Sequence, residues 1–475
     1  MRRKEVYAAI ERSYITMNKK NHNDITKQHE FRKKYIIDDK SLTDDEKLEA
    51  INMLNGNYNF DKIRCNIGPK KICQDCNNES LAITYCEYCI RIYLEEKFST
   101  WTSKNDEIDN LIQKCQNKSL APNRIVEWIP YNRLKDIKYF TKGGCSEIFM
   151  ATWIDGYFNE WDPKEKRLKR AGTHEVILKI LKNVEDANRN WFDEAILHLT
   201  ISNKWAEIVL CNGLTQDPKT GDYMIVMERM DSDLRDYLKL YRNKLTWKKK
   251  IKIVFDIVEA LYFIHEEKVI HRDLHSGNIL YFHGYNSWYI SDLGFCGPAD
   301  NPSSSIYGNL PYIAPEVILE KKYTQASDIY SIGIIMWEIS SGYPPFYNCK
   351  HNYDLAMDII NGKRPKIAKE TETPREYKEL MEQCWNSDPS KRPKIDVLFD
   401  GIEKMWIDSY NITETNTLKV TNLELINSLQ NSQLYFSNFS SKVYNSNDLP
   451  SKVDLEEFHT KPYDFNIPSN NSSEL

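Results

Sequence analysis

Short apolar runs dominate the chain from about Leu134 onward. The segments IKYF, EIFMATW, EVILKIL and YMIVMER have the length and composition of strands. Helical spacing of three and four positions begins at 191–200 and recurs at Ile251, Val254, Val258 and Leu261. Strand patterns return at 279–281 and 288–291, and the sequence after Ala314 has helical periodicity. Strands first and helices later predict an α+β fold, with a small sheet-rich lobe before a larger helical lobe.

The chain before this point is more polar. Residues 1–40 are strongly charged without a sustained period, so we expect them to be flexible. Thr43 and Glu46 have the spacing of a helix capping box, which predicts a short helix ending near Leu54. One further helix is indicated by apolar residues at Ile108, Leu111, Ile112 and Cys115.

These patterns divide the chain into five parts. They are a polar, partly helical region (1–62), a cysteine-paired module (63–95), a helical linker (96–130), the two-lobed domain (131–406) and a tail (407–475). The tail is rich in Asn and Ser, which predicts disorder. Within the two-lobed domain, the charged stretch 159–172 is predicted to be an exposed insertion between two strands, and 329–339 a buried helix.

Composition narrows the class of protein. A hydrophobic fraction of 41% and a charged fraction of 28% over 475 residues are typical of a globular protein. The formal net charge of -5 gives no field that would favour nucleic acid or an anionic membrane as the main partner. The N-terminus lacks the apolar run of a secretory signal, and no apolar run is long enough to span a membrane. The 11 cysteines, seven of them scattered singly, favour a reducing compartment, so we expect the cytosol or the nucleus.

The string His271-Arg272-Asp273-Leu274-His275-Ser276-Gly277-Asn278 carries the most specific chemistry. Asp273 could orient a hydroxyl and accept its proton, while Asn278 could ligate magnesium through its amide oxygen. Fourteen residues later Asp292-Leu293-Gly294 follows a strand, where a second carboxylate could hold magnesium between phosphates. Alone, Asp-Leu-Gly usually marks a turn.

Ala314-Pro315-Glu316 completes a set of three motifs in a fixed order. With these motifs the chain resembles the eukaryotic protein kinases over about Leu134 to Trp406. The resemblance implies a bilobal protein kinase fold, with one helix beside an antiparallel sheet in the small lobe. It also implies ATP and Mg²⁺ as cofactors and proteins as substrates.

The family then assigns residues in the small lobe. Lys179 resembles the third-strand lysine that neutralises phosphates, and Glu194, 15 residues later, resembles its helical partner. The hinge beside adenine corresponds to Met227, as gatekeeper, with Glu228 and Met230.

The glycine-rich loop departs from the pattern of the family. Thr141 and Ser146 stand where the first and third glycines are usual, and the loop residues expected beside the phosphates are Thr141, Gly143, Gly144 and Ile148. Glycine allows the closest backbone approach to phosphate, so the two replacements predict a loosened or repositioned loop.

Four residues of the large lobe also match the family. Asp328 resembles the aspartate that braces the catalytic loop, and Arg392 resembles the arginine that pairs with Glu316. Arg272 resembles the arginine that pairs with a phosphate on the activation segment, which here corresponds to residues 292–316. The hydroxyls within its reach are Ser303, Ser304, Ser305 and Tyr307, although the run NPSSS also suits a plain polar loop.

Two strings indicate which group of protein kinases the chain resembles. They are HRDLHSGN and, near the end of the domain, CW...DP..RP. Both resemble the tyrosine-kinase-like group, which implies serine and threonine as acceptors. SLTDDEK, a double CxxC and EWIPYNRL are similar to the expanded kinase families of mycorrhizal fungi. His275 replaces a lysine usual in serine/threonine kinases and Asn309 a docking threonine, which leaves the acceptor type open.

Two CxxC pairs precede the two-lobed domain. Four thiolates at Cys73, Cys76, Cys86 and Cys89 suit tetrahedral zinc, and the polar segment around them is too small to form a core unaided. The alternative is a pair of ordinary turns carrying reduced thiols, because the gap is shorter than the common zinc template.

The sequence therefore predicts an ATP-dependent protein kinase. The alternative is a pseudokinase that binds protein partners with little catalysis, which Thr141, Ser146, Leu293 and His198 would suit. Against it, all five polar groups that the chemistry needs are present.

Overall fold

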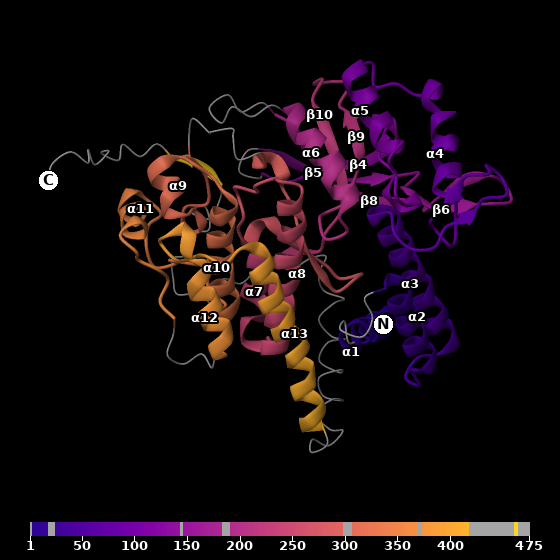
Figure 1. Cartoon of the computed structure of the whole chain (residues 1–475). Coiled ribbons are helices and arrows are strands. Elements are labelled where there is room, and N and C mark those ends of the chain that lie inside the picture. The colour runs from indigo at the N-terminus through magenta and orange to yellow at the C-terminus, as the bar shows by residue number, and fades with distance from the viewer. Residues whose placement is uncertain are drawn as a thin grey trace.

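The computed structural model of the chain describes residues 2–17, 24–142, 146–182, 191–297, 306–367, 373–417 and 460–463. Figure 1 shows the sheet of the small lobe on one side and the helices of the C-terminal half on the other. The N-terminal helices α1–α3 lie beside both.

The N-terminal region is a bundle of three helices, α1 (Arg2–Thr16), α2 (Ile25–Asp38) and α3 (Asp44–Cys65). The predicted capping box is present, because Thr43 Oγ1 accepts the Glu46 N–H and Glu46 Oε2 accepts the Thr43 N–H. Val6, Ile36 and Leu54 meet in a small core between the helices.

Two predictions for this region are wrong. The described parts of residues 1–40 are largely helical rather than flexible, and the third helix continues past Leu54 to Cys65. Each helix contributes only a few apolar residues, so no segment shows a broad apolar stripe by itself. The core exists only when the three helices pack together.

The helix α3 also contacts the two-lobed domain. The Arg64 guanidinium lies 4.4 Å from the ring centroid of Trp205 and 5.4 Å from that of Phe263. These two rings stack on each other at 4.1 Å. Tyr7 of α1 contacts Tyr285 edge-on.

The cysteine module is a hairpin followed by a helix. Its strands are β1 (Lys71–Ile72) and β2 (Glu79–Ser80), and its helix is α4 (Glu87–Glu95). The linker contains η2 (Phe98–Thr100), α5 (Asp106–Gln116) and η3 (Pro122–Arg124). The expected apolar face of α5 buries Ile108 and Ile112 against the core of the small lobe, so this linker helix is packed onto the domain.

The small lobe is built on a six-stranded sheet in the order β3-β9-β10-β8-β5-β4, with η4 (Tyr131–Arg133) before β4. All neighbours are antiparallel except β3 and β9. One helix, α6 (Trp191–Lys204), belongs to the lobe. The strands are β3 (Glu127–Trp128), β4 (Leu134–Lys142), β5 (Glu147–Trp153), β8 (His174–Ile180), β9 (Cys211–Gln216) and β10 (Tyr223–Glu228).

The charged insertion forms a second hairpin, β6 (Phe158–Asp162) and β7 (Arg167–Arg170). It lies between β5 and β8 and most of its residues are exposed, as predicted, but Trp161 and Leu168 are buried against Ile90 and Leu94 of α4. Alternation within the hairpin puts these two on one face while its charges face outward. The insertion therefore attaches the cysteine module to the small lobe.

The large lobe is helical, as predicted. Residues 329–339 lie in α10 and are buried throughout. The large lobe also contains a three-stranded sheet of β11 (Ser232–Asp233), β12 (Ile279–Phe282) and β13 (Ser287–Ile290). The loop 271–278 leads into β12, and Asp292 follows β13. The α-helices are α7 (Leu234–Tyr241), α8 (Trp247–Glu266), α9 (Pro315–Glu320), α10 (Gln325–Ser341), α11 (Tyr353–Ile360), α12 (Arg375–Cys384) and α13 (Ile395–Thr417). The short 3-10 turns are η6 (Arg242–Lys244), η7 (Ser276–Asn278), η8 (Leu293–Phe295), η9 (Leu310–Tyr312) and η10 (Pro389–Lys391).

The tail is more ordered than its composition indicated. Helix α13 continues through residues 407–417, and Lys461–Tyr463 form the strand β15, paired with β14 (Ile306–Gly308). Disorder is the wrong prediction for these two stretches, and the rest of the predicted tail lies outside the described residues. Within the described part of the chain, no helix combines the length and the apolar character needed to cross a bilayer.

Candidate active site

The loop 271–278, between α8 and β12, is held by one buried carboxylate. Asp328 of α10 accepts the backbone N–H of His271 through Oδ2 (2.8 Å) and that of Arg272 through Oδ1 (3.0 Å). Arg272 has a φ of 69°, in the left-handed region, which costs roughly 1–2 kcal/mol for a residue with a side chain. The two hydrogen bonds to Asp328 offset that cost and fix the loop.

Asp273 is buried at the centre of this loop. Asn278 donates through Nδ2 to the backbone carbonyl of Asp273 (2.8 Å) and more weakly to its Oδ2 (3.4 Å). Thr460 Oγ1 donates to the same Oδ2 at 2.7 Å. Asp273 Oδ1 accepts no hydrogen bond from the described residues. The carboxylate is therefore directed at a hydroxyl from outside its own loop.

Lys179 of β8 joins two carboxylates. Its Nζ lies 2.8 Å from Glu194 Oε1 of α6 and 2.6 Å from Asp292 Oδ1, which follows β13. The expected pair of Lys179 and Glu194 is thus present. The side chains of Lys179 and Glu194 are 8% and 0% exposed, whereas that of Asp292 is 29% exposed, so the group opens to solvent at Asp292.

His198, one turn after Glu194, forms a hydrogen bond with the backbone of Leu293. Its Nε2 accepts the Leu293 N–H at 3.3 Å and lies 3.9 Å from Glu194 Oε1. Glu194, His198 and Asp292 bring ligand atoms within 4.8 Å of one another. The Lys179 ammonium already binds both carboxylates, and its charge would repel a metal ion at that point.

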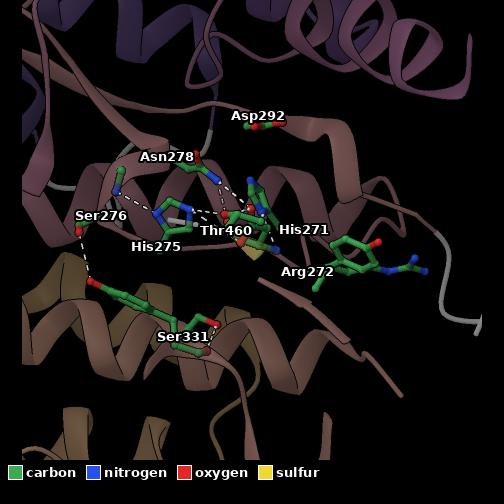
Figure 2. Close-up of polar contacts among 12 residues, drawn as sticks. His271, Arg272, His275, Ser276, Asn278, Asp292, Ser331 and Thr460 are labelled. Carbon is green, nitrogen blue, oxygen red and sulfur yellow. Dashed lines mark hydrogen bonds and ion pairs between the residues drawn. The ribbon is translucent and has the colours of Figure 1, made fainter. Parts of the chain in front are cut away.

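Asn278 and Asp292 have the donor atoms that magnesium prefers. Figure 2 shows both side chains on the same side of Thr460. Because Nδ2 of Asn278 is engaged by Asp273, its amide oxygen is turned away from that carboxylate. Carboxylate and amide oxygens are hard ligands suited to Mg²⁺. The two residues therefore fit this ion.

The predicted hinge lies at the end of β10. Met227 is buried and faces Ile177 across the sheet. The Glu228 N–H donates to the Leu210 carbonyl (3.0 Å), and its carboxylate contacts His174 Nε2 at 3.0 Å. This hydrogen bond raises the pKa of His174. Met230 packs at the edge of the small-lobe core.

Part of the glycine-rich loop can be placed. Thr141, near the end of β4, pairs with Ile148 of β5, and Ile148 pairs on its other side with Lys179. Ser146, the residue in place of the third glycine, is buried. Gly143 and Gly144 lie outside the described residues.

The end of the activation segment is anchored by an ion pair. Arg392 binds Glu316 with two parallel hydrogen bonds, Nη1 to Oε1 (2.6 Å) and Nη2 to Oε2 (2.7 Å). It also donates to the carbonyls of Ala326 (2.8 Å) and Asn386 (2.9 Å). The pair expected from the sequence is therefore present and has bidentate geometry.

Residues 135–402, more than half of the chain, match the family described as protein tyrosine and serine/threonine kinase. The chain belongs to this family. It therefore contains an ATP-dependent protein kinase domain, as the motifs predicted.

Similar proteins carry kinase names. The chain is 32% identical over 247 residues to the dual serine/threonine and tyrosine protein kinase of Pimephales promelas, covering 50% of this chain and 26% of that protein. The protein of the same name from Danio rerio is 32% identical over 246 residues, covering 50% and 27%. The probable serine/threonine-protein kinase roco5 of Dictyostelium discoideum is 28% identical over 354 residues, covering 70% and 12%. The kinase thus spans about a quarter, or less, of the length of these relatives.

The residues predicted to regulate the kinase are only partly described. Ser303, Ser304 and Ser305 lie outside the described residues. Tyr307 is 5% exposed in β14, and its ring stacks on Phe295 at 5.5 Å. Arg272 lies 5.7 Å from the ring of Tyr323, and burial lowers the pKa of its guanidinium. In this arrangement the Tyr307 ring is covered, and a switching role for Arg272 stays a prediction.

Two residues at the site of the kinase were missed from the sequence. Thr460 contacts both Asp273 and His275, and the nearby Tyr463 is buried in the core of the large lobe. A threonine in an Asn- and Ser-rich tail gives no local signal. Only the apolar Tyr463 close behind it could have indicated that this part of the tail is docked.

The four paired cysteines of the kinase converge. Their sulfur atoms all lie within 4.8 Å of one another, with Cys73 3.6 Å from Cys89 and Cys76 3.6 Å from Cys86. These separations exceed a disulfide bond by more than 1 Å. Burial alone would raise the pKa of Cys73, but the backbone N–H groups of Cys76 and Asp75 lower it to about 7. The hairpin turn and the first turn of α4 thus present four thiols to one point.

Proposed function

We propose that this kinase is catalytically active and transfers the γ-phosphoryl group of ATP to protein hydroxyls, serine or threonine in preference to tyrosine. The observation that carries the proposal is the 2.7 Å contact between Thr460 Oγ1 and Asp273 Oδ2. A general base must lie within about 2.6–3.2 Å of the atom whose proton it takes. A threonine hydroxyl fits at that distance from Asp273.

Each polar group has a role in this proposal. Asp273 orients the acceptor and takes its proton, with Asn278 holding the carboxylate in place. Lys179, held by Glu194, binds phosphate oxygens as a point charge. Asn278 and Asp292 would hold magnesium, which when bound would neutralise the charge of the phosphates. The adenine and phosphates contact residues at the hinge and glycine-rich loop, namely Thr141, Gly143, Gly144, Ile148, Met227, Glu228 and Met230.

The preference for serine or threonine has two supports. The hydroxyl beside Asp273 belongs to a short side chain, which brings its backbone close to the catalytic loop. The relatives carry names of serine/threonine or dual-specificity kinases. His275 occupies the position of the usual lysine, and its Nε2 lies 3.1 Å from the same hydroxyl.

Phosphoamino-acid analysis tests the activity and the acceptor type together. The purified protein is incubated with labelled ATP, magnesium and a generic protein substrate, beside an Asp273→Asn control. We expect phosphoserine or phosphothreonine with the wild type and neither with the control. Phosphotyrosine as the main product would overturn the acceptor assignment, and equal labelling by both proteins would overturn the activity.

The second candidate is a pseudokinase scaffold. Thr141 and Ser146 replace two glycines, and Leu293 replaces the usual aromatic residue. In the fold, however, Leu293 is buried in the large-lobe core and Ser146 is buried, so both replacements fit without removing a polar group of the site. ATP binding without measurable transfer to any protein would favour the scaffold.

We infer that the domain belongs to the tyrosine-kinase-like group and is related to the expanded kinase families of mycorrhizal fungi. The support is the resemblance of HRDLHSGN, of the CW...DP..RP end and of the N-terminal motifs. A phylogeny of the domain alone would test the group, and sharing of the N-terminal cysteine module would test the fungal relationship.

We also propose that phosphorylation of the activation segment orders it against Arg272. A phosphate adds roughly -1.5 to -2 charges and three acceptor oxygens, enough for one to three charge-assisted hydrogen bonds. The acceptors are Ser303–Ser305 or Tyr307, of which the last must first leave its buried position. A variant with Ala at 303–305 and Phe at 307 should be as slow as phosphatase-treated enzyme. If both match untreated enzyme, the proposal fails.

The cysteine cluster is proposed to bind one zinc ion. Four convergent thiols match the tetrahedral Cys₄ site of structural zinc, and a hairpin of two-residue strands has little core of its own. The hairpin β6–β7 then links the zinc module to the small lobe through Trp161 and Leu168.

The remaining assignments are also proposals. We propose protein substrates as the partners, with no role for nucleic acid, and a location in the cytosol or the nucleus. The division into 1–62, 63–95, 96–130, 131–406 and 407–475 is proposed with two refinements, because α5 packs on the small lobe and α13 extends past 406.

A further inference from the structure

The strand β15 lies along the activation segment as an added strand. Lys461, Pro462 and Tyr463 pair antiparallel with Gly308, Tyr307 and Ile306, respectively. Tyr463 is 7% exposed and belongs to the large-lobe core, and its hydroxyl accepts the Leu310 N–H at 3.4 Å. A peptide that adds to a sheet edge in this way gains affinity from the backbone and specificity from alternate side chains. The register of the segment is therefore fixed by Tyr463.

This register brings Thr460 to the catalytic loop. Its hydroxyl donates to Asp273 Oδ2 at 2.7 Å and lies 3.1 Å from His275 Nε2. Figure 2 shows Thr460 beside His275. Thr460 is 8% exposed. Both hydrogen-bonding functions of one buried hydroxyl are thus used by residues of the HRDLHSGN loop.

The contacts also fix the direction of each proton. The Gly277 N–H donates to His275 Nδ1 at 3.0 Å, so in the neutral ring the hydrogen is on Nε2. That Nε2–H donates to Thr460 Oγ1, and the hydroxyl in turn donates to Asp273. The Thr460 oxygen keeps its proton and directs it at the base, which is the arrangement of an acceptor about to react.

We propose that Thr460 is an intramolecular substrate of the kinase and that Thr460–Tyr463 occupies the acceptor site until Thr460 is phosphorylated. The proposal rests on the proposed kinase activity and names its first acceptor. The bond from Thr460 Oγ to the γ-phosphorus of ATP forms, and the bond from that phosphorus to the β,γ-bridging oxygen breaks, releasing ADP. The proton of Thr460 passes to Asp273 and then to solvent.

Phosphorylation would also release the segment. The product places roughly -1.5 to -2 charges beside the Asp273 carboxylate in a buried site, where like charges repel strongly. Pairing of Tyr463 and the strand with β14 is the attraction that must be overcome. The unmodified segment therefore blocks protein substrates, and its phosphorylation opens the site to them.

The test uses the full-length protein, treated with phosphatase and then given ATP and magnesium. Mass spectrometry follows phosphate at Thr460 over a series of protein concentrations, and a generic protein substrate is assayed in parallel. The variants are Thr460→Val, which keeps the shape without the hydroxyl, Tyr463→Ala, which removes the anchor, and Thr421→Val as a control elsewhere in the tail.

We expect phosphate at Thr460 in the wild type and in Thr421→Val, with a rate constant independent of protein concentration. Thr460→Val should show a persistently low rate on the generic substrate. Tyr463→Ala should raise the initial rate roughly tenfold or more, because a buried aromatic anchor no longer holds the segment in place.

The outcomes separate this inference from the proposed function. Phosphorylation of the generic substrate with no phosphate at Thr460 would overturn the intramolecular acceptor and leave the kinase activity standing. A rate constant proportional to protein concentration would overturn the intramolecular step, and an unchanged initial rate in Tyr463→Ala would overturn the block. No transfer to any acceptor would overturn the proposed function itself.

Discussion

Replacing Arg392 by methionine tests the anchor of the activation segment. Arg392→Met keeps the length and the apolar stem of the side chain but removes every donor. Two oxygens of Glu316 and the carbonyls of Ala326 and Asn386 then lose the hydrogen bonds that Arg392 now gives them. The change therefore isolates the charge and its hydrogen bonds from packing.

The size of the effect follows from burial. The side chain of Arg392 is 0% exposed and that of Glu316 is 15% exposed. Removing one partner of a buried pair costs about 3–5 kcal/mol, and water that reaches the partly exposed carboxylate places the value toward the lower end. Arg392→Lys keeps the charge but loses the bidentate geometry, so we expect a smaller loss of about 1–3 kcal/mol.

Urea denaturation followed by tryptophan fluorescence measures the loss as a change in midpoint at constant slope. The control is Arg375→Met, because Arg375 pairs with Glu379 on the surface of α12 with 90% of its side chain exposed. Breaking that pair should change the free energy of unfolding by no more than about 0.5 kcal/mol. Equal midpoints for Arg392→Met and Arg375→Met would refute the view that Glu316 and Arg392 form a buried structural pair.

Three further predictions concern chemistry. Asp273→Ala should lower the rate of phosphoryl transfer by roughly 10²–10⁴-fold, with nucleotide affinity nearly unchanged in a titration, because the base acts on the acceptor; wild-type turnover would exclude that role. Lys179→Met should weaken both ATP binding and turnover, since its charge is proposed to lie on the phosphates, and normal ATP kinetics would contradict this. The purified kinase should contain about one zinc per chain by elemental analysis, and Cys73→Ser should remove it, because three thiolates hold zinc less well than four; wild-type protein purified without chelators and free of metal would exclude the site.

The polar groups of the candidate site were predictable because the proposed chemistry constrains residue type and order. Asp273, Asn278 and Asp292 are read from short strings in a fixed sequence, and the fold then brings Lys179 and Glu194 together from β8 and α6. The two-lobed order of strands and helices follows from periodicity alone. Such signals are local, so they can be recognised in a single amino-acid sequence.

Contacts between distant segments could not be predicted in this way. The bundle of α1–α3 depends on a few apolar residues from each helix, and the hairpin β6–β7 depends on burial of Trp161 against α4. The position of Thr460 depends on a strand pairing across more than 150 residues. In each case the sequence of the segment is polar, and the partner that buries it lies far along the chain.

The contact of Arg64 with Trp205 and Phe263 bears on where the catalytic fragment can be cut. A fragment that starts at the family match would lack α3, so a guanidinium that covers two stacked aromatic rings would be missing. Trp205 follows α6 of the small lobe and Phe263 belongs to α8 of the large lobe, so the same guanidinium touches both halves of the catalytic unit. The unit to express is therefore longer than the unit that sequence similarity delimits. Its helix α3 stabilises the contact between the residue that follows α6 and helix α8.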